Sequence, residues 1–208
     1  ERSLYSSNSI TLDRNTRISL TGSISNEVYE NLKFDRGSLS LSASSQITKR
    51  IYIRGSYKLQ NRPYYYTLEQ GEGQSISGRL NLQLTDNFNS EWNYSFSDLF
   101  NKETGDKYYD VHIIRSKNTY QLNKYLFLRV IVQYNSLSTA ISPDFLASFT
   151  YIPGTVVHLG YGSVFRQTRW DAASGDAGEY VDSRDYLETV RGLFFKASYL
   201  FRYKGLKK

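Results

Sequence analysis

Few side chains in this sequence have the types and spacing that catalysis or metal binding requires. Its 208 residues include two histidines and no cysteine, which excludes thiolate nucleophiles, thiolate metal sites and disulfides. The histidines, His112 and His158, lie in separate predicted strands, and no spacing links either one to a nucleophile or to a second metal ligand. No pair of carboxylates is arranged as an acid–base couple, and no glycine-rich phosphate loop is present. We therefore expect no catalytic residues, no cofactor and no enzymatic activity.

One predicted loop carries three carboxylates with glycines between them: Asp171, Asp176 and Glu179. Calcium needs about six to eight oxygen ligands, and this spacing does not match the helix–loop–helix calcium pattern. We interpret these acids as a solvated outer loop, so they are weak candidates and no bound metal is predicted.

Two predicted long loops carry aromatic rings that could contact a ligand: Tyr64, Tyr65, Tyr66 and Trp170. Such rings could stack on a sugar, pack the loops together or belong to an aromatic girdle at a membrane surface. The sequence leaves these three interpretations open. The four rings are candidate ligand contacts of the outer loops.

The elements that must position these groups are β-strands, because the dominant pattern has a period of two. Ile18, Leu20 and Ile24 alternate with serines, threonine and arginine, and the same alternation recurs along most of the chain. Successive side chains of a strand point to opposite faces, so each segment has one apolar and one polar face. No segment has a sustained helical period, and the prolines, Pro63, Pro143 and Pro153, fall at predicted segment ends.

Eleven strands are predicted, and their connections alternate between short and long. The strands cover about 4–13, 16–27, 37–48, 51–61, 74–85, 88–99, 108–122, 125–135, 144–152, 155–167 and 191–203. The long connections lie near 28–36, 62–73, 100–107, 136–143 and 168–190. Strands of this length, with all short turns at one end, are typical of an antiparallel up-and-down transmembrane β-barrel of the bacterial outer membrane. No apolar run is long enough for a membrane-spanning helix.

The count and direction of the strands predict that the barrel continues beyond this chain. If the short turns are periplasmic, the first strand begins at the outer end, whereas a single-chain barrel starts in the periplasm and has an even number of strands. We therefore expect residues 1–203 to form the C-terminal portion of a larger barrel and residues 204–208 to form a basic periplasmic tail.

The second half of the chain carries a resemblance to a known family. It rests on the stretches 120–135, 149–155, 158–161 and 194–202, which are rich in Tyr, Phe and Leu. Together they resemble the C-terminal barrel of a Bacteroidota outer-membrane family of unknown function, whose members pair it with an N-terminal domain similar to family-9 carbohydrate-binding modules. The resemblance implies a membrane barrel and transfers no catalytic residue. The resemblance covers about residues 108–203, and the first hundred residues match it only in being barrel-like.

The polar faces of the predicted strands are basic, in a chain of net charge +6. The basic residues assigned to them are Arg17, Arg54, Lys58, Arg79, Arg115, Lys117, Arg129, Lys196 and Arg202. Because charge facing lipid costs about 2–4 kcal/mol at the midplane, we expect these side chains to face a lumen, where Glu91 is the one securely placed acid. Water and anions, acidic groups of a missing segment that plugs the barrel, or acids of the outer loops could neutralise them. The plug is favoured because so many strands enclose more space than side chains fill.

The function expected from these features is passage or docking of a solute or partner across the outer membrane. The expected partners are membrane lipid, lipopolysaccharide and either upstream residues of the same protein or a partner protein. Scattered basic residues do not indicate nucleic-acid binding. The alternatives are the C-terminal barrel region of a TonB-dependent transporter and a soluble extracellular all-β protein that binds carbohydrate. An enzymatic barrel would need a Ser–His or Asp–His pair at the outer rim, and none is evident.

Overall fold

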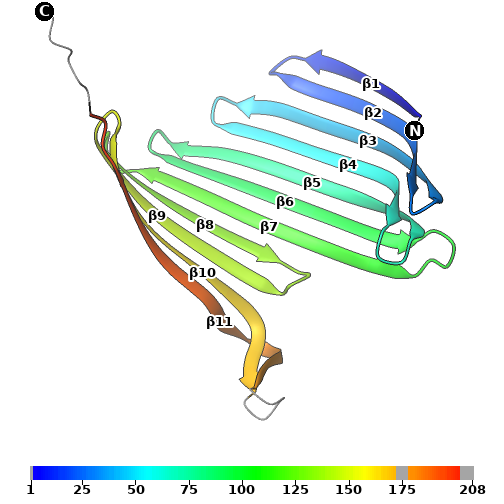
Figure 1. The fold of residues 1–208 in the computed structure, drawn as a ribbon. Coiled ribbons are helices and arrows are strands. Elements are labelled where there is room, and N and C mark those ends of the chain that lie inside the picture. The colour runs from blue at the N-terminus through cyan, green and yellow to red at the C-terminus, as the bar shows by residue number, and fades with distance from the viewer. Residues whose placement is uncertain (1, 172–177, 202–208) are drawn as a thin grey trace, which may run out of the picture. The chain divides into compact units, whose positions relative to one another are not determined.

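The structure is a computed structural model that describes residues 2–171 and 178–201, and its described part is all-β. No described residue is helical, so no described helix could span a membrane. The eleven strands, labelled in Figure 1, are β1 (Ser3–Leu12), β2 (Thr16–Tyr29), β3 (Leu32–Thr48), β4 (Ile51–Tyr64), β5 (Glu69–Thr85), β6 (Phe88–Asn101), β7 (Lys107–Gln121), β8 (Leu126–Asn135), β9 (Ala140–Ile152), β10 (Thr155–Asp171) and β11 (Glu179–Ser198).

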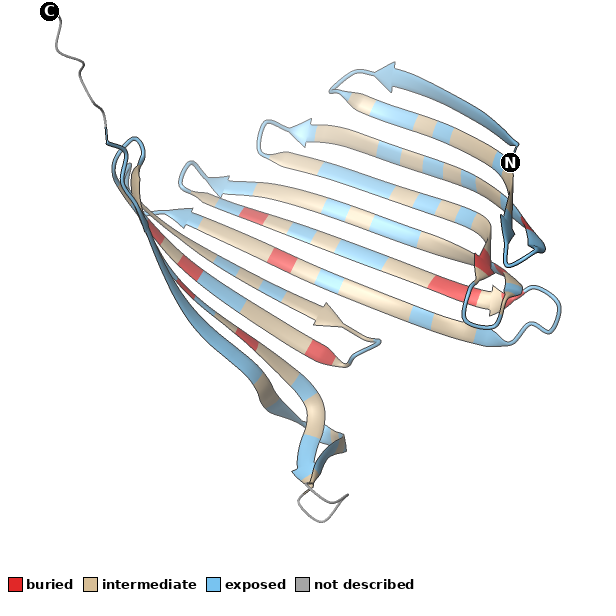
Figure 2. Ribbon diagram, in the orientation of Figure 1, coloured by how far each residue is buried: buried red, intermediate tan, exposed pale blue. Residues whose placement is uncertain are grey.

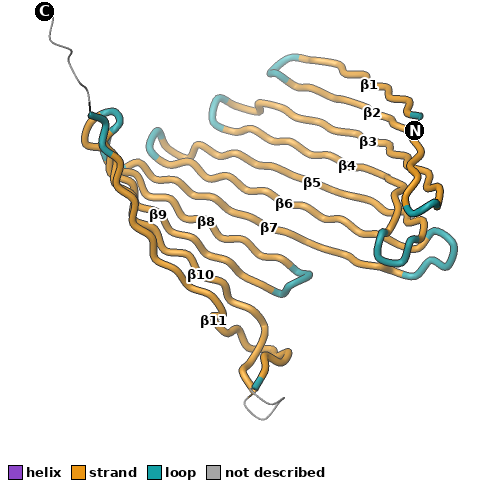
Figure 3. The backbone as a smooth tube through the Cα atoms, viewed as in Figure 1, coloured by secondary structure: helices purple, strands orange, loops and turns teal. Residues whose placement is uncertain are grey.

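The strands follow one another through a single antiparallel sheet in the order of the chain. Each strand from β2 to β10 pairs with its predecessor and its successor, and hairpins connect them (Figure 3). Within the described residues β1 and β11 do not pair with each other, so the sheet is not closed. The prediction of eleven antiparallel up-and-down strands is therefore confirmed at the level of the sheet.

The chain divides into two compact units. The first comprises residues 1–83, 91–115 and 134–138, and the second comprises residues 84–90, 116–133 and 139–208. The first unit holds β1 to β4 and most of β5, and the second holds β10 and β11.

The register of the first unit separates apolar from polar side chains across neighbouring strands. Directly opposed residues share a face, and Leu20 opposes Leu41, which opposes Tyr57, which in turn opposes Ile76. One position along, a row of serines crosses five strands. It consists of Ser9, Ser19, Ser42, Ser56 and Ser77. The period of two seen in the sequence is thus realised as one apolar face and one hydroxyl-rich polar face.

The apolar face has no layer packed on it among the described residues, because its side chains remain about half exposed. Leu20, Leu41 and Leu59 are 47%, 51% and 46% exposed. Figure 2 shows that buried positions are few and scattered along the strands. The described apolar side chains that are buried are Phe34, Leu99, Ala140 and Leu146. Phe34 shares the polar face, since it opposes Glu27.

Several predicted boundaries are wrong, because the strands run further than the sequence pattern indicated. The predicted long loop at 28–36 is a two-residue turn, Glu30–Asn31, in which both residues have positive φ angles of 50° and 66°. Asparagine tolerates that conformation, and two such residues make the tight turn that suits twisted strands. The strict alternation of short and long connections is therefore also wrong, because this turn is no longer than Lys49–Arg50.

The last two strands differ most from the prediction. β11 begins at Glu179, not at 191, and ends at Ser198 within the described residues. β10 continues to Asp171, and residues 179–188 of the predicted long connection at 168–190 belong to β11. Charged residues on both faces concealed the alternation there, and register shifts after Val164 and Gln167 broke its period.

Pro143 lies inside β9, although the sequence placed it at a segment end. The pairing of β9 with β10 is interrupted at this point, between the pairs Asp144–Gly162 and Ile141–Phe165. A residue without an N–H group therefore sits where the ladder makes no regular pair.

The register can be tested with an engineered disulfide, because the chain has no native cysteine. In the pair Ser56 and Ser77, the two Oγ atoms lie 2.7 Å apart on directly opposed residues. We expect Ser56→Cys/Ser77→Cys to form an intramolecular disulfide under mild oxidation, read from gel mobility and mass. The control Ser56→Cys/Gly78→Cys places the thiols on opposite faces and should stay reduced. Oxidation of the control in preference to Ser56→Cys/Ser77→Cys would show that the register is shifted by one residue, and equal oxidation of both would show that the pairing is not fixed.

Candidate functional site

The candidate site lies on the polar face of the first unit, at the end where β2 turns into β3 and β4 turns into β5. The alternation continues past the predicted strand ends, so Arg36 follows the polar-face series of Ser40 and Ser38. In β4, Arg62 likewise extends the series of Lys58 and Gln60. Strand geometry alone therefore places both arginines on the hydroxyl-rich face.

A basic groove of about 340 Å³ occupies this part of the polar face. Its defining side chains are the cations Arg36, Lys58 and Arg62 and the hydroxyls of Ser23, Ser25 and Ser38. Ser23 and Ser38 are hydrogen-bonded through their Oγ atoms at 2.9 Å, which links β2 and β3 across the groove. Volumes of this size are at the lower end of the usual range for small-ligand sites, about 300–1,000 Å³.

A tyrosine hollow of about 310 Å³ shares Arg36 and Arg62 with the basic groove. Its aromatic side chains are Tyr64, Tyr65, Tyr66 and Tyr109. The three consecutive tyrosines that the sequence marked as possible ligand contacts are therefore next to two guanidinium groups.

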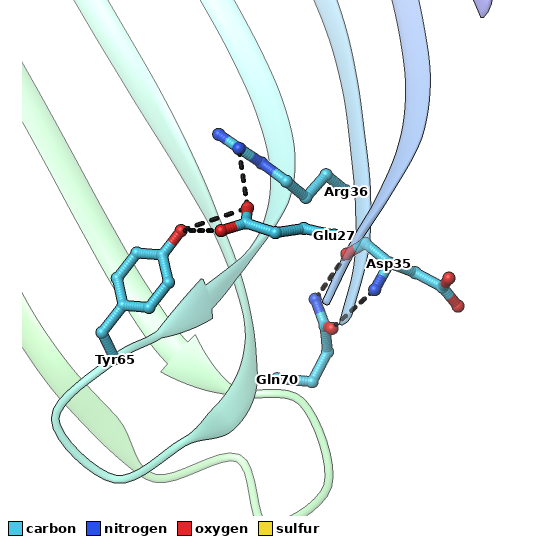
Figure 4. A network of polar contacts seen from close by, with 5 residues as sticks. All are labelled: Glu27, Asp35, Arg36, Tyr65 and Gln70. Carbon is cyan, nitrogen blue, oxygen red and sulfur yellow. Dashed lines mark hydrogen bonds and ion pairs between the residues drawn. The ribbon is translucent and has the colours of Figure 1, made fainter. Parts of the chain in front are cut away.

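A network of polar contacts ties the turns at this end together (Figure 4). Arg36 Nη1 donates to Glu27 Oε2 at 2.9 Å, and the Tyr65 hydroxyl donates to both Glu27 oxygens at 3.0 and 3.2 Å. Gln70 binds the Asp35 backbone twice: its Oε1 accepts the N–H at 3.2 Å, and its Nε2 donates to the carbonyl at 2.8 Å. The β2–β3 turn region is thus connected to the β4–β5 turn and to β5.

The Tyr65 hydroxyl is held in its donor form by its surroundings. Partial burial raises the pKa of this phenol above its usual value, and the hydrogen bond to the Glu27 carboxylate raises it further. The hydroxyl therefore stays protonated to a higher pH than a free phenol does, and its hydrogen bonds to Glu27 persist with it. Its ring packs edge-on against Tyr29, with centroids 5.1 Å apart.

The rings around the hollow differ in how much surface they leave open. Tyr64 stacks on Tyr108 with centroids 4.1 Å apart, and the Tyr108 hydroxyl donates to Glu69 Oε2 at 2.6 Å. Tyr66 lies 6.1 Å from Tyr64 in a stacked orientation and is 93% exposed. Tyr64 is thus fixed by its neighbour, whereas Tyr66 presents ring surface to solvent.

Arg62 has a buried donor without an acceptor among the described residues. Its guanidinium lies 5.7 Å from the centre of the Tyr109 ring. Its Nε is buried and has no hydrogen-bond partner in the described part of the chain. No carboxylate among the described residues lies within ion-pair distance of Arg62 or Lys58, whereas Arg36 is paired with Glu27. The groove therefore has excess positive charge and a donor that needs an acceptor.

Four of the basic residues predicted to share the polar face lie on it in the first unit. Arg17, Arg54 and Arg79 form one row, in which Arg17 opposes Ser44, Ser44 opposes Arg54, and Arg54 opposes Arg79. Lys58 lies in the basic groove. Arg79 Nε donates to Asn93 at 2.8 Å and lies 4.0 Å from Glu91, so the acid expected on this face is close to one end of the row.

Four of the remaining predicted basic residues, Arg115, Lys117, Arg129 and Lys196, lie in later strands. Ile114 lines an apolar hollow with Trp92 and Tyr94. Arg115 is the next residue in β7, so the alternation puts it on the polar face, as predicted. In β11, Lys196 opposes His158. Lys117 lies in β7 and Arg129 in β8. Arg202 lies outside the described residues.

The other sequence candidates belong to the second unit, whereas the groove belongs to the first. Trp170 belongs to the second unit and packs edge-on against Tyr180, with centroids 5.0 Å apart. Asp171 opposes Glu179 in the β10–β11 ladder, and Asp176 lies outside the described residues. No group of three potential metal ligands occurs among the residues that the structure describes.

The two histidines have different surroundings. His112 Nδ1 is 3.0 Å from the Tyr94 hydroxyl, and its ring lies 4.6 Å from that of Phe96, so it belongs to an aromatic cluster. His158 opposes Ser148, and its Nδ1 is buried without a partner in the described residues. Neither arrangement is that of a nucleophile and its base.

Arg36, Arg62, Glu27 and Tyr109 are residues of the site that the sequence analysis did not select. For Arg36 and Arg62, the signal that could have found them is the period of two, which continues through the predicted long connections at 28–36 and 62–73. Glu27 and Tyr109 lie inside predicted strands, and their part in the site depends on contacts between strands.

Comparison with protein-family models, curated proteins and solved structures found no match for this chain. The geometry of the sheet and its groove is therefore the basis for any functional conclusion.

A glycine of β5 permits the close strand approach beside the site. A Cβ added at Gly73 would lie 2.3 Å from the backbone oxygen of Asp98, and one at Gly71 would lie 3.0 Å from Leu99, which is 1% exposed and lines the tyrosine hollow. We expect Gly73→Ala to lower the free energy of unfolding by about 1–3 kcal/mol, because backbone must move to relieve the clash.

The matched control is Gly78→Ala in the same strand, where an added Cβ meets nothing within 4 Å. Urea unfolding followed by circular dichroism would compare the two variants with the native chain. If Gly73→Ala is as stable as Gly78→Ala, the close approach of β5 and β6 is wrong.

Proposed function

We propose that this sheet is the wall of a β-barrel in the bacterial outer membrane, and that anionic solutes pass or dock along its polar face. In this proposal the apolar face contacts lipid and the polar face borders the interior. The chemistry of the two faces supports the proposal of a closed barrel and of a membrane location.

The observation that carries the proposal is the continuous apolar face. Leu20, Leu41, Tyr57 and Ile76 form a cross-strand row in which every side chain remains exposed. Soluble proteins rarely leave contiguous apolar patches larger than a few hundred Å² exposed, and a larger one marks a protein or membrane contact. Lipid would cover such a face without requiring a complementary protein surface.

Strand length and aromatic placement agree with this arrangement. β3 and β5 have 17 residues each, more than the roughly 9–11 that cross a bilayer at a tilt. The surplus extends toward the end where Tyr64, Tyr65 and Tyr66 lie, as outer-membrane strands extend beyond the apolar band. The tyrosine hollow and the polar network would then stand at the outer rim.

The charge of the polar face favours anions. Arg54 and Arg79 oppose each other directly in neighbouring strands. Two like charges in directly opposed positions destabilise a sheet unless water or counterions screen them. Rings of arginine and lysine select anions in pores. A segment bearing acidic groups that plugs the interior would neutralise the same charges, so the proposal covers both passage and docking.

A second candidate is a soluble extracellular protein that binds carbohydrate, and the tyrosine hollow is the observation that favours it. Fractionation distinguishes the two. A membrane barrel needs detergent for extraction and migrates faster on gels before heating, whereas a secreted binder is released without detergent. In the second case another protein surface must cover the apolar face.

A pair of neighbouring substitutions tests which face contacts lipid. Leu41 and Ser42 are adjacent in β3 and point to opposite faces. In phospholipid vesicles we expect Leu41→Arg to lower the free energy of unfolding by about 2–4 kcal/mol, because it places a charge in the hydrocarbon. Ser42→Arg should have a much smaller effect on urea unfolding. Equal effects would contradict contact of the apolar face with lipid.

Ion selectivity tests the polar face. We expect the native protein reconstituted in a planar bilayer to show an anion-selective reversal potential in a salt gradient, and Arg54→Gln/Arg79→Gln to shift it toward zero. The control Lys49→Gln/Arg50→Gln removes the same charge from a turn and should leave the potential unchanged. Cation selectivity, or equal shifts in both variants, would reject the electropositive interior. Blocked conductance in the native protein that opens in the Arg54→Gln/Arg79→Gln variant would indicate docking of a plug.

A further inference from the structure

We infer that the basic groove and the tyrosine hollow together form a binding site for a soluble sugar that bears an oxyanion, either a carboxylate or a phosphate. The inference deepens the proposed function and rests on it in one respect, namely that solutes reach the polar face. It names the chemical class of the solute and the residues that recognise it.

The unsatisfied donor of Arg62 favours an anionic ligand. A buried N–H without an acceptor costs about 1–3 kcal/mol, so an acceptor at this position stabilises the site. The Nε of Arg62 is such a group. Guanidinium binds carboxylate and phosphate through two parallel hydrogen bonds, and Tyr109 beneath the Arg62 guanidinium restricts its orientation. Because Nε is closed to solvent in the ligand-free chain, an anion in the groove reaches it when the Arg62 side chain turns toward the groove.

The cations of the groove outnumber the carboxylates that neutralise them. Glu27 is the carboxylate whose side chain takes part in this network, where Asp35 contributes its backbone, and Glu27 is held by Arg36 and Tyr65. Lys58 and Arg62 remain without an acidic partner among the described residues and line the same groove. The site therefore has about two excess positive charges, which suits a single oxyanion group.

Hydroxyl groups and an exposed aromatic ring lie around the cations, and both suit a sugar. Ser23, Ser25 and Ser38 provide hydroxyls that both donate and accept hydrogen bonds, as sugar hydroxyls require. Tyr66 provides an exposed ring at the adjoining hollow, next to the shared arginines. Hydroxyls on one side and an amphipathic ring on the other fit a polar ring-shaped molecule better than a bare inorganic anion.

The polar face also distinguishes between two sources of such a ligand. Phosphorylated sugars occur free in solution and in the head groups of lipopolysaccharide. The groove opens on the face opposite Leu39, Leu41 and Leu59, which would contact lipid. A head group anchored on the lipid side is therefore separated from Lys58 and Arg62 by the sheet itself, and a soluble ligand is the better fit.

The test is calorimetric titration of the full chain in detergent micelles with glucose 6-phosphate, galacturonate, glucose and inorganic phosphate. We expect both anionic sugars to bind more tightly than glucose and inorganic phosphate. Arg62→Gln should weaken their binding at least about tenfold, because a charge-assisted hydrogen bond is lost, and Lys58→Gln should weaken it as well. Circular dichroism of each variant confirms that the sheet is intact.

The matched control is Lys33→Gln, which removes the same charge from β3 on the other face, opposite Val28. It should leave sugar binding unchanged. Equal losses in Lys33→Gln and Arg62→Gln would reduce the effect to general electrostatics and overturn the inference, as would equal affinities for glucose 6-phosphate and inorganic phosphate. Lipopolysaccharide binding that Arg62→Gln weakens as much as sugar binding would overturn the assignment to a soluble ligand.

Binding in micelles does not require conductance, so the two proposals fail separately. A chain that binds anionic sugars but shows no selective conductance would contradict passage and retain the site. A chain that is anion-selective but binds neither sugar up to millimolar concentration would contradict the site alone.

Discussion

The constraint on which the rest of this structure depends is the side-chain period of two in a strictly antiparallel register. A shift of one residue between β3 and β4 would bring Leu41 opposite a serine or lysine and exchange the two faces of the pair. The serine row from Ser9 to Ser77 exists only because four successive registers agree. Both the apolar face and the basic groove follow from that agreement.

The polar face changes character along the strands. In the middle it consists of short hydroxyl side chains, such as Ser42 and Ser56, which lie close to the sheet and leave its surface open. Toward the β4–β5 turn it contains buried Phe34 and Leu99 together with several tyrosines, so it gains a small packed region of its own. This packing and the hydrogen bonds of Glu27 and Gln70 hold the strand ends in place. The cations at the end of the groove therefore have packed and hydrogen-bonded neighbours.

The same arrangement explains why the site is basic and still compatible with a folded sheet. Arg36 is neutralised by Glu27, and Arg62 packs over an aromatic ring, so neither cation faces another directly. Lys58 is a neighbour of serines across both of its strand pairs, opposite Ser40 and Ser75. Repulsion among the cations is thereby limited, while their combined field remains available to an anion.

The sequence by itself determined the class of fold, the number of strands and which side chains share a face. These properties depend on the alternation of side chains such as Ile18, Leu20 and Ile24, which acts between residues two apart in the chain. The tertiary structure decided where the strands end, because polar residues such as Arg36 and Arg62 carry the same signal in a loop as on a polar strand face. It also decided which cations gain partners, since Glu27, Tyr65 and Tyr109 come from separate strands and turns and meet only through the register of the sheet.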